Sequence, residues 1–209
     1  MRMQRLFGLI VLSTLLACAS ARADGIADLH AFVAATRTAT ANFSQDVYDR
    51  HHQLRQHSSG TLAFSRPGRF RWVYGDPVDQ TIVGDGHTLW LYDAGLQQVT
   101  ERQLDRALGN TPAALLAGDN DIDRYYSLQS DGQHDGLEWL IATPKQQDGS
   151  FRAIHMGFRN GMLARMIIED NFGSTTDLRL QNLRSNPRLP ADTFQFTPPA
   201  NADVISDLK

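Results

Sequence analysis

Cysteine is almost absent from this 209-residue sequence, and the single one, Cys18, lies near the start. One cysteine excludes a disulfide framework and every zinc or iron–sulfur site that needs several cysteines. An excess of positive charge is also missing, because the formal net charge is −3. The chain therefore has no general basic surface for nucleic acid.

Catalytic motifs are missing as well. The sequence contains no Gly-x-Ser-x-Gly, His-Glu-x-x-His, P-loop or dinucleotide-binding fingerprint. His51, His52 and His57 stand in a polar stretch that is more typical of a solvated loop than of a metal site. The adjacent Glu169 and Asp170 would point to opposite faces of a strand and make a poor acid/base pair. We expect no enzyme, no cofactor and no metal.

The first residues have the order of an export signal. Arg2 and Arg5 precede the apolar run 6–16, and the small residues Ala21 and Ala23 close the segment. The apolar run is too short to span a bilayer, which needs roughly 20 residues. We expect residues 1–23 to be cleaved as a signal peptide. Cleavage removes three arginines and no acid, so the mature charge would be −6.

Two alternatives remain for this segment. A buried N-terminal helix is the first. The second is a lipoprotein signal, because residues 15–18 read Leu-Leu-Ala-Cys and Cys18 could become an acylated first residue. A mature N-terminus at Asp24 indicates soluble export, and an acylated Cys18 indicates a lipid anchor. The mass of the mature protein distinguishes them.

The mature chain, residues 24–209, contains no repeat or linker and is expected to form a single domain. Apolar residues at helical spacing predict a helix over 25–40. A second, short helix is predicted over 111–117, where Thr111 caps, Pro112 suits the first turn and Gly118 ends it.

Alternating apolar residues predict strands through most of the remainder. They include the stretches around 61–64, 70–74 and 89–92, and the ranges 137–143, 151–158, 162–170 and 175–183. Tight-turn pairs separate them, at 85–86, 135–136, 148–149 and 160–161. Many short strands joined by tight turns predict an antiparallel sandwich or barrel. Whether the helices fill its concave face or roof a cavity is left open by the pattern.

Eight segments together carry a resemblance to a known family. They are NFSQ (42–45), SGTLAFSRPGRFRW (59–72), IVGDG (82–86), LWLYD (89–93), GNTPAALLA (109–117), LIATPK (140–145), DNFG (170–173) and FQFTPP (194–199). In this order and spacing the chain resembles the LolA family of periplasmic outer-membrane lipoprotein carriers, over essentially the whole mature length.

The resemblance implies a mainly β fold with some α: an incomplete, half-open antiparallel β-barrel with a helical lid over an apolar cavity. It implies a periplasmic carrier, without catalysis, that takes acylated lipoproteins from the inner-membrane LolCDE transporter. The cavity would shield the acyl chains until delivery to the outer-membrane receptor LolB. One copy suffices for such a carrier, so a monomer is expected.

The resemblance also implies site residues. Arg66 would hold the lid shut by bonding backbone carbonyls at the end of the lid helix, at Leu116 and Ala117. Phe70 matches an aromatic that affects exchange with the transporter. The residues expected to line the acyl-chain cavity or to contact a partner are Leu62, Phe64, Phe70, Trp72, Trp90 and Leu115.

Other functions are kept open from the residues alone. The chain could be an anchored receptor of the same fold with Cys18 as its lipid site. It could also be an exported lipid hydrolase, against which the lack of a nucleophile motif speaks. A purely structural β-domain is the fourth possibility, and it would bind no lipid.

Overall fold

The sheet dominates the structure. The computed structural model describes residues 24–208 except 76, 105–115, 119–120 and 147–150. These residues build one twelve-stranded sheet in the order β12-β6-β5-β4-β3-β2-β1-β11-β10-β9-β8-β7. The strands are β1 (Thr38–Tyr48), β2 (Leu54–Ser65), β3 (Arg69–Tyr74), β4 (Gln80–Asp85), β5 (Thr88–Asp93), β6 (Gln98–Gln103), β7 (Tyr126–His134), β8 (Leu137–Pro144), β9 (Phe151–Arg159), β10 (Met162–Asp170), β11 (Thr175–Ser185) and β12 (Asp203–Asp207).

The sheet curls but does not close. Neighbouring strands are antiparallel, apart from β12, which runs parallel to β6. β12 and β7 form the two edges and, within the described residues, do not pair with each other. The predicted half-open antiparallel barrel is therefore confirmed.

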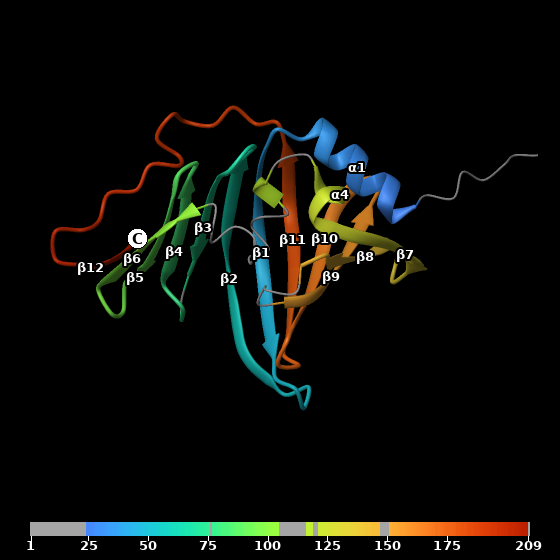
Figure 1. Ribbon diagram of the computed structural model, residues 1–209, viewed down its shortest axis with the longest axis horizontal. Helices are drawn as coiled ribbons and strands as arrows, with labels where there is room; N and C mark the ends of the chain where they lie inside the picture. Colours follow the sequence, from blue (N-terminus) through green and yellow to red (C-terminus); the bar gives the residue numbers. More distant parts are fainter. Residues whose placement is uncertain (1–23, 76, 105–115, 119–120, 147–150, 209) are drawn as a thin grey trace, which may run out of the picture.

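Helices cover one side of the curled sheet. α1 (Gly25–Ala35) lies across β7 to β10, and the four-residue α4 (Ile122–Tyr125) precedes β7 (Figure 1). The Asp24 carboxylate caps α1 by accepting the N–H of Ile26 at 3.2 Å. No helix among the described residues is long and apolar enough to cross a membrane.

The predicted helix 25–40 is too long at its C-terminal end. α1 ends at Ala35, Thr36 already has an extended backbone (φ −109°, ψ 97°), and β1 begins at Thr38. β-Branched threonines favour strands. β1 also pairs on both sides, with β2 and with β11, so tertiary pairing overrides the helical spacing.

Two of the predicted tight turns, at 135–136 and 160–161, have the expected geometry. At 85–86 only Gly86 has a positive φ, 105°, and Asp85 still belongs to β4. Asn160 and Gly161 both have positive φ, 52° and 73°, as do Asp135 and Gly136, 55° and 70°. Positive φ at both central residues defines the hairpin turns that Asn-Gly and Asp-Gly favour. The pair at 148–149 lies outside the described residues. Of the predicted helix 111–117, Leu116 and Ala117 are described, and both are helical.

A chain of charges crosses the convex face, here called the charge ladder: Arg165, Asp177, Arg179, Asp46 and His57. Arg165 donates to both oxygens of Asp177 at 2.8 and 2.9 Å, and Arg179 bonds both Asp177 and Asp46. His57 Nδ1 lies 2.6 Å from Asp46 Oδ1, and this hydrogen bond lowers the pKa of the Asp46 carboxyl. The ladder ties together β10, β11, β1 and β2.

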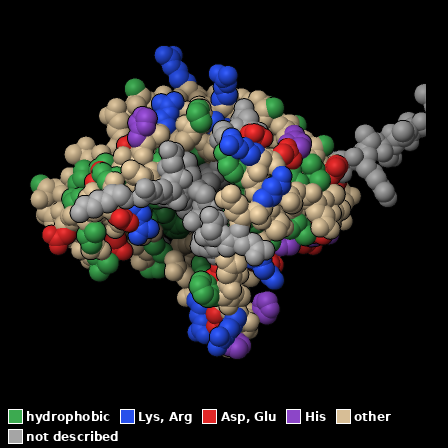
Figure 2. All heavy atoms as spheres, viewed as in Figure 1, with side chains coloured by type: hydrophobic (Ala, Val, Ile, Leu, Met, Phe, Trp, Pro, Cys, Tyr) green, Lys and Arg blue, Asp and Glu red, His purple; other side chains and the backbone are tan. Residues whose placement is uncertain are grey.

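The β1–β2 hairpin protrudes from the body, with arginine and histidine side chains gathered at its tip (Figures 1 and 2). Asp49 Oδ1 accepts the backbone N–H groups of His51 and Gln53. The bonds from Gln53, Arg55 and His51, in that order of size, lower the pKa of Asp49 to about 2. The expectation that His51, His52 and His57 share one solvated loop is wrong for His57. That residue lies in β2, where it pairs with Asp46 of β1.

Candidate functional site

An apolar wall lines the concave face of β1 to β5. Alternation along each strand turns every second side chain to this face. The register places Leu62 opposite Trp72 and Phe64 opposite Phe70. The wall consists of Phe43, Leu62, Phe64, Phe70, Trp72 and Leu89, none more than 7% exposed. Four of the predicted cavity residues, from two strands, therefore lie together on one face.

A glycine makes room for Phe70 in the apolar wall. Gly84 of β4 is paired with Phe70, and the Phe70 ring lies over it. A Cβ at position 84 would lie 2.4 Å from Cε1 of Phe70. The absence of a side chain in β4 thus fixes where the ring of Phe70 lies.

Helical segments are buried together with the apolar wall. The same buried cluster contains Leu29 and Phe32 of α1, Leu104, Leu116, Ala117 and Ile122. Leu104, Leu116 and Ala117 are at most 2% exposed. We call residues 104, 116–118 and 121–122 the cover. In this structure the apolar wall is buried, in one cluster with residues of α1 and of the cover.

Arg66 lies where β2 ends, at the border between the apolar wall and α1. Its guanidinium carbon lies 5.3 Å from the ring centre of Phe64 and 5.8 Å from that of Phe32. Its three side-chain nitrogens are buried and have no hydrogen-bond partner in the described part of the chain. Burial lowers the pKa of Arg66 to about 10, so the group stays charged at neutral pH. A buried cation with free donors favours carbonyl acceptors.

The turn after Arg66 contacts the cover directly. The backbone N–H of Gly68 donates to the carbonyl oxygen of Ala117 at 2.6 Å. The bond that Arg66 itself was expected to make with the end of the lid helix is not among the contacts of the described residues, and it stays a prediction. The structure does place Arg66, Leu116 and Ala117 around one buried cluster.

One predicted cavity residue, Trp90, is not brought to the apolar wall. Trp90 pairs with Val83, whereas its neighbour Leu89 pairs with Gly84, so Trp90 points to the convex face. There its ring centre lies 5.7 Å from that of Phe196, in the C-terminal segment. Its role as a partner contact stays a prediction. Leu115 lies outside the described residues.

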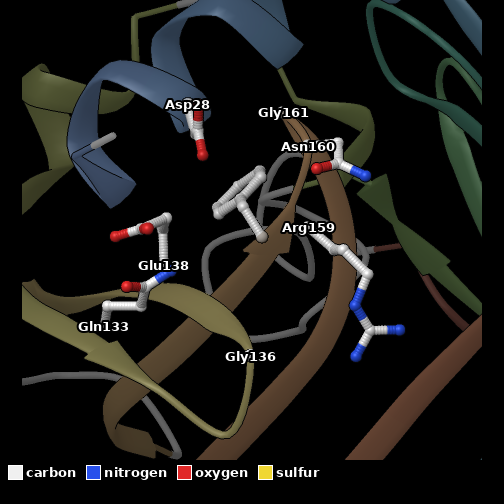
Figure 3. A pocket seen from close by; sticks show the side chains of 8 residues that line it. Asp28, Gln133, Gly136, Glu138, Arg159, Asn160 and Gly161 are labelled. Carbon is white, nitrogen blue, oxygen red and sulfur yellow. The ribbon is translucent and has the colours of Figure 1, made fainter. Parts of the chain in front are cut away.

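A polar hollow lies at a different place, under α1. It has a volume of about 320 Å³, and its lining comes from α1, β7, β8, the end of β9 and the β9–β10 turn. Asp28, Gln133 and Glu138 face the space, while the Arg159 guanidinium turns away (Figure 3). Burial raises the pKa of the Asp28 carboxyl. Carboxylates and amides suit water or polar groups, so this hollow is unsuited to acyl chains.

The sequence reasoning missed several residues of the site. Phe43, on β1, packs 5.2 Å from Trp72 and 5.1 Å from Tyr74, measured between ring centres. Alternation of Ala39, Ala41 and Phe43 with polar residues was the signal that could have found it. Phe32 lies at an apolar position of the predicted helix 25–40, but its contact with Arg66 joins elements that only the fold brings together.

Comparisons with known proteins agree with this architecture. The sequence profile described as "Outer membrane lipoprotein carrier protein LolA" matches residues 34–197. An outer-membrane lipoprotein carrier protein of Nitrosomonas europaea is 46% identical over 206 residues, covering 98% of this chain and all of the relative. One of Dechloromonas aromatica is 46% identical over 187 residues, covering 90% of each chain.

Solved structures share the fold at low identity. A LolA-superfamily protein from Nitrosomonas europaea has a TM-score of 0.50 at 12% identity, covering 83% of this chain and 98% of its own. An uncharacterised conserved protein of Thermus thermophilus has a TM-score of 0.55 at 13% identity, covering 87% and 97%.

A half-open sheet with an apolar concave wall and a helical cover defines a class of non-enzymatic carrier folds, as the sequence predicted. Within that class, the match over most of the chain shows that it belongs to the LolA family of outer-membrane lipoprotein carrier proteins.

Proposed function

We propose that this chain is a periplasmic carrier that receives acylated lipoproteins from the LolCDE transporter and delivers them to the LolB receptor. The relatives named as lipoprotein carriers support the cargo class. The observation that carries the proposal is the apolar wall on the concave face of an open sheet, buried in one cluster with residues of α1 and of the cover. Residues 1–23, with Cys18, lie outside the described residues, so the receptor alternative rests on sequence alone.

Cargo entry exchanges one apolar contact for another. Leu104, Leu116 and Ile122 bury their side chains against the rest of the cluster. Exposing three such side chains costs about 5–9 kcal/mol. Each CH₂ of an acyl chain that replaces them contributes about 0.8 kcal/mol. A single chain of ordinary length is therefore enough to offset opening of the cover.

Delivery requires that the affinity of the carrier for its cargo stays below a limit. A triacylated lipoprotein has on the order of 40 CH₂ groups, and full burial would nominally give about 30 kcal/mol. Non-covalent affinities stop near 18–21 kcal/mol, and a carrier at that limit could not release its cargo. A closed state that competes with cargo lowers the net affinity and makes transfer to a receptor possible.

Arg66 is proposed as the latch of that closed state. Its buried guanidinium has unpaired hydrogen-bond donors. Gly68, two residues further along the chain, already donates to the carbonyl of Ala117 in the cover. Bonds from a charged donor to carbonyls contribute about 1.5–3 kcal/mol each when they are sheltered from water. Such a latch would bias the cover toward closure and drive cargo out.

Replacement of Arg66 by leucine tests the latch. Arg66→Leu keeps an apolar side chain beside Phe64 but removes every donor. We expect the loaded variant to retain its lipoprotein, with transfer to LolB slowed about 10- to 100-fold through loss of one such bond. Transfer is measured as radiolabelled lipoprotein moving from purified carrier to purified receptor.

Arg69→Leu is the matched control. Arg69 is exposed, donates to Ser65 Oγ at 3.2 Å and lies over Phe194, away from the cover. It should transfer cargo as the unmodified protein does. Normal hand-over by Arg66→Leu would refute the latch.

A further inference from the structure

Unsatisfied hydrogen-bond donors gather on the concave side of the sheet. In the described part of the chain, the buried side-chain atoms without a partner are Nε, Nη1 and Nη2 of Arg66, Nε1 of Trp72 and Oγ of Ser58. Trp72 belongs to the apolar wall, Ser58 is opposite Gln45 on the same face, and Arg66 lies against Phe64. Each of these groups carries a hydrogen to donate.

Trp72 differs from the other two tryptophans in this respect. Nε1 of Trp90 donates to Asp85 Oδ2 at 3.2 Å, and Nε1 of Trp139 donates to the carbonyl of His134 at 3.0 Å. Trp72 is 7% exposed and has no acceptor in the described residues. Buried indole N–H groups ordinarily find a partner, because leaving one unpaired costs free energy.

The surroundings of Trp72 offer rings and aliphatic groups. It is paired with Leu62 and Ile82, and its ring centre lies 5.2 Å from that of Phe43. Tyr74, two residues along β3, already donates its hydroxyl to Gln45 at 3.3 Å. An occupant of this part of the apolar wall must therefore be mostly apolar and must bring its own acceptor.

Fatty-acyl groups have that composition. A hydrocarbon chain has no acceptor, but the ester or amide that links it has a carbonyl oxygen, which is a strong one. We propose that Trp72 Nε1 donates to the carbonyl oxygen of an acyl ester or amide, so that the apolar wall recognises acyl rather than alkyl chains. This inference rests on the proposed function, because it requires that acyl chains reach the concave face.

The test compares three probes of equal chain length, delivered from cyclodextrin: methyl palmitate, N-methylpalmitamide and hexadecyl methyl ether. The first two separate ester from amide, and the third lacks the carbonyl. We expect the unmodified protein to bind whichever carbonyl compound fits about 3- to 10-fold more tightly than the ether, as one neutral hydrogen bond allows. Trp72→Phe keeps a ring but should bring that ratio to about one, with the affinity for the ether unchanged.

Trp90→Phe is the matched control, because it removes an indole from the convex face and should leave the ratio as it is. A Trp72→Phe protein that keeps the full carbonyl preference overturns the proposal, and so does an unmodified protein with no preference. Equal binding of all three probes contradicts the carbonyl site but leaves the carrier function standing. If none of the three probes binds, both the carbonyl site and the carrier function are contradicted.

A measurement on the unmodified protein guards against misfolding of the variant. A ¹⁵N–¹H correlation spectrum follows the N–H groups of the three tryptophan indoles. The Trp72 signal should move downfield with a carbonyl probe and not with the ether, while those of Trp90 and Trp139 stay. An unmoved Trp72 signal at saturating methyl palmitate and N-methylpalmitamide contradicts the inference.

Discussion

At the scale of single residues, Gly84 shows how a missing side chain shapes the apolar wall. Gly84→Ala places a Cβ 2.4 Å from Cε1 and 2.8 Å from Cδ1 of Phe70, so the ring must shift. Overpacking of a core typically costs about 1–3 kcal/mol. We expect the free energy of unfolding, measured in urea, to fall by that amount. Gly75→Ala is the control, because the nearest atom to its Cβ is 3.8 Å away. A Gly84→Ala protein as stable as the Gly75→Ala protein would contradict this packing.

At this scale the sequence could predict which side chains are buried on one face, where alternation along the strand is strict. Leu62, Phe64, Phe70 and Trp72 could be predicted as one buried set because β2 and β3 alternate strictly. Trp90 also alternates, but alternation does not say which face is concave. On β5 the convex face is apolar too, because Phe196 of the distant C-terminal segment packs on it.

At the scale of elements, the charge ladder ties the central strands together. Asp177 is 4% exposed, and both Arg165 and Arg179 bond its carboxylate. Asp177→Asn leaves two arginines facing a neutral amide. Loss of one partner in a sheltered, charged network costs about 2–4 kcal/mol, and the urea midpoint should fall accordingly.

Glu169→Gln on β10 is the comparison for the charge ladder. Glu169 pairs with Arg152, which is 69% exposed, and an exposed pair contributes at most about 1 kcal/mol. Equal losses for Glu169→Gln and Asp177→Asn would show that the charge ladder adds no more than a surface pair.

The elements themselves were partly predictable. Hairpins such as β9–β10 follow from a local signal, because Asn160–Gly161 supplies both positive φ angles. The end of α1 and the parallel pairing of β12 with β6 could not be found this way. Both depend on pairing partners far along the chain, which local spacing does not encode.

At the scale of the whole molecule, the fold separates a buried apolar wall from the segments that bury it. A sheet that closed into a full barrel would leave no room for exchange, whereas an open one lets α1 and the cover complete the core. The general architecture was predictable from the resemblance and the strand pattern. The burial of the apolar wall in this state was not, because it depends on how distant helices pack.

Release of lipoproteins from spheroplasts tests the central claim most directly. Purified protein beginning at Asp24 is incubated with spheroplasts that are making labelled lipoproteins, and the soluble fraction is examined after the cells are removed. We predict that lipoproteins appear there in a complex with the protein, in amounts that rise with its concentration. Lipoproteins that stay in the spheroplast pellet at every concentration, as they do with buffer, would contradict the account.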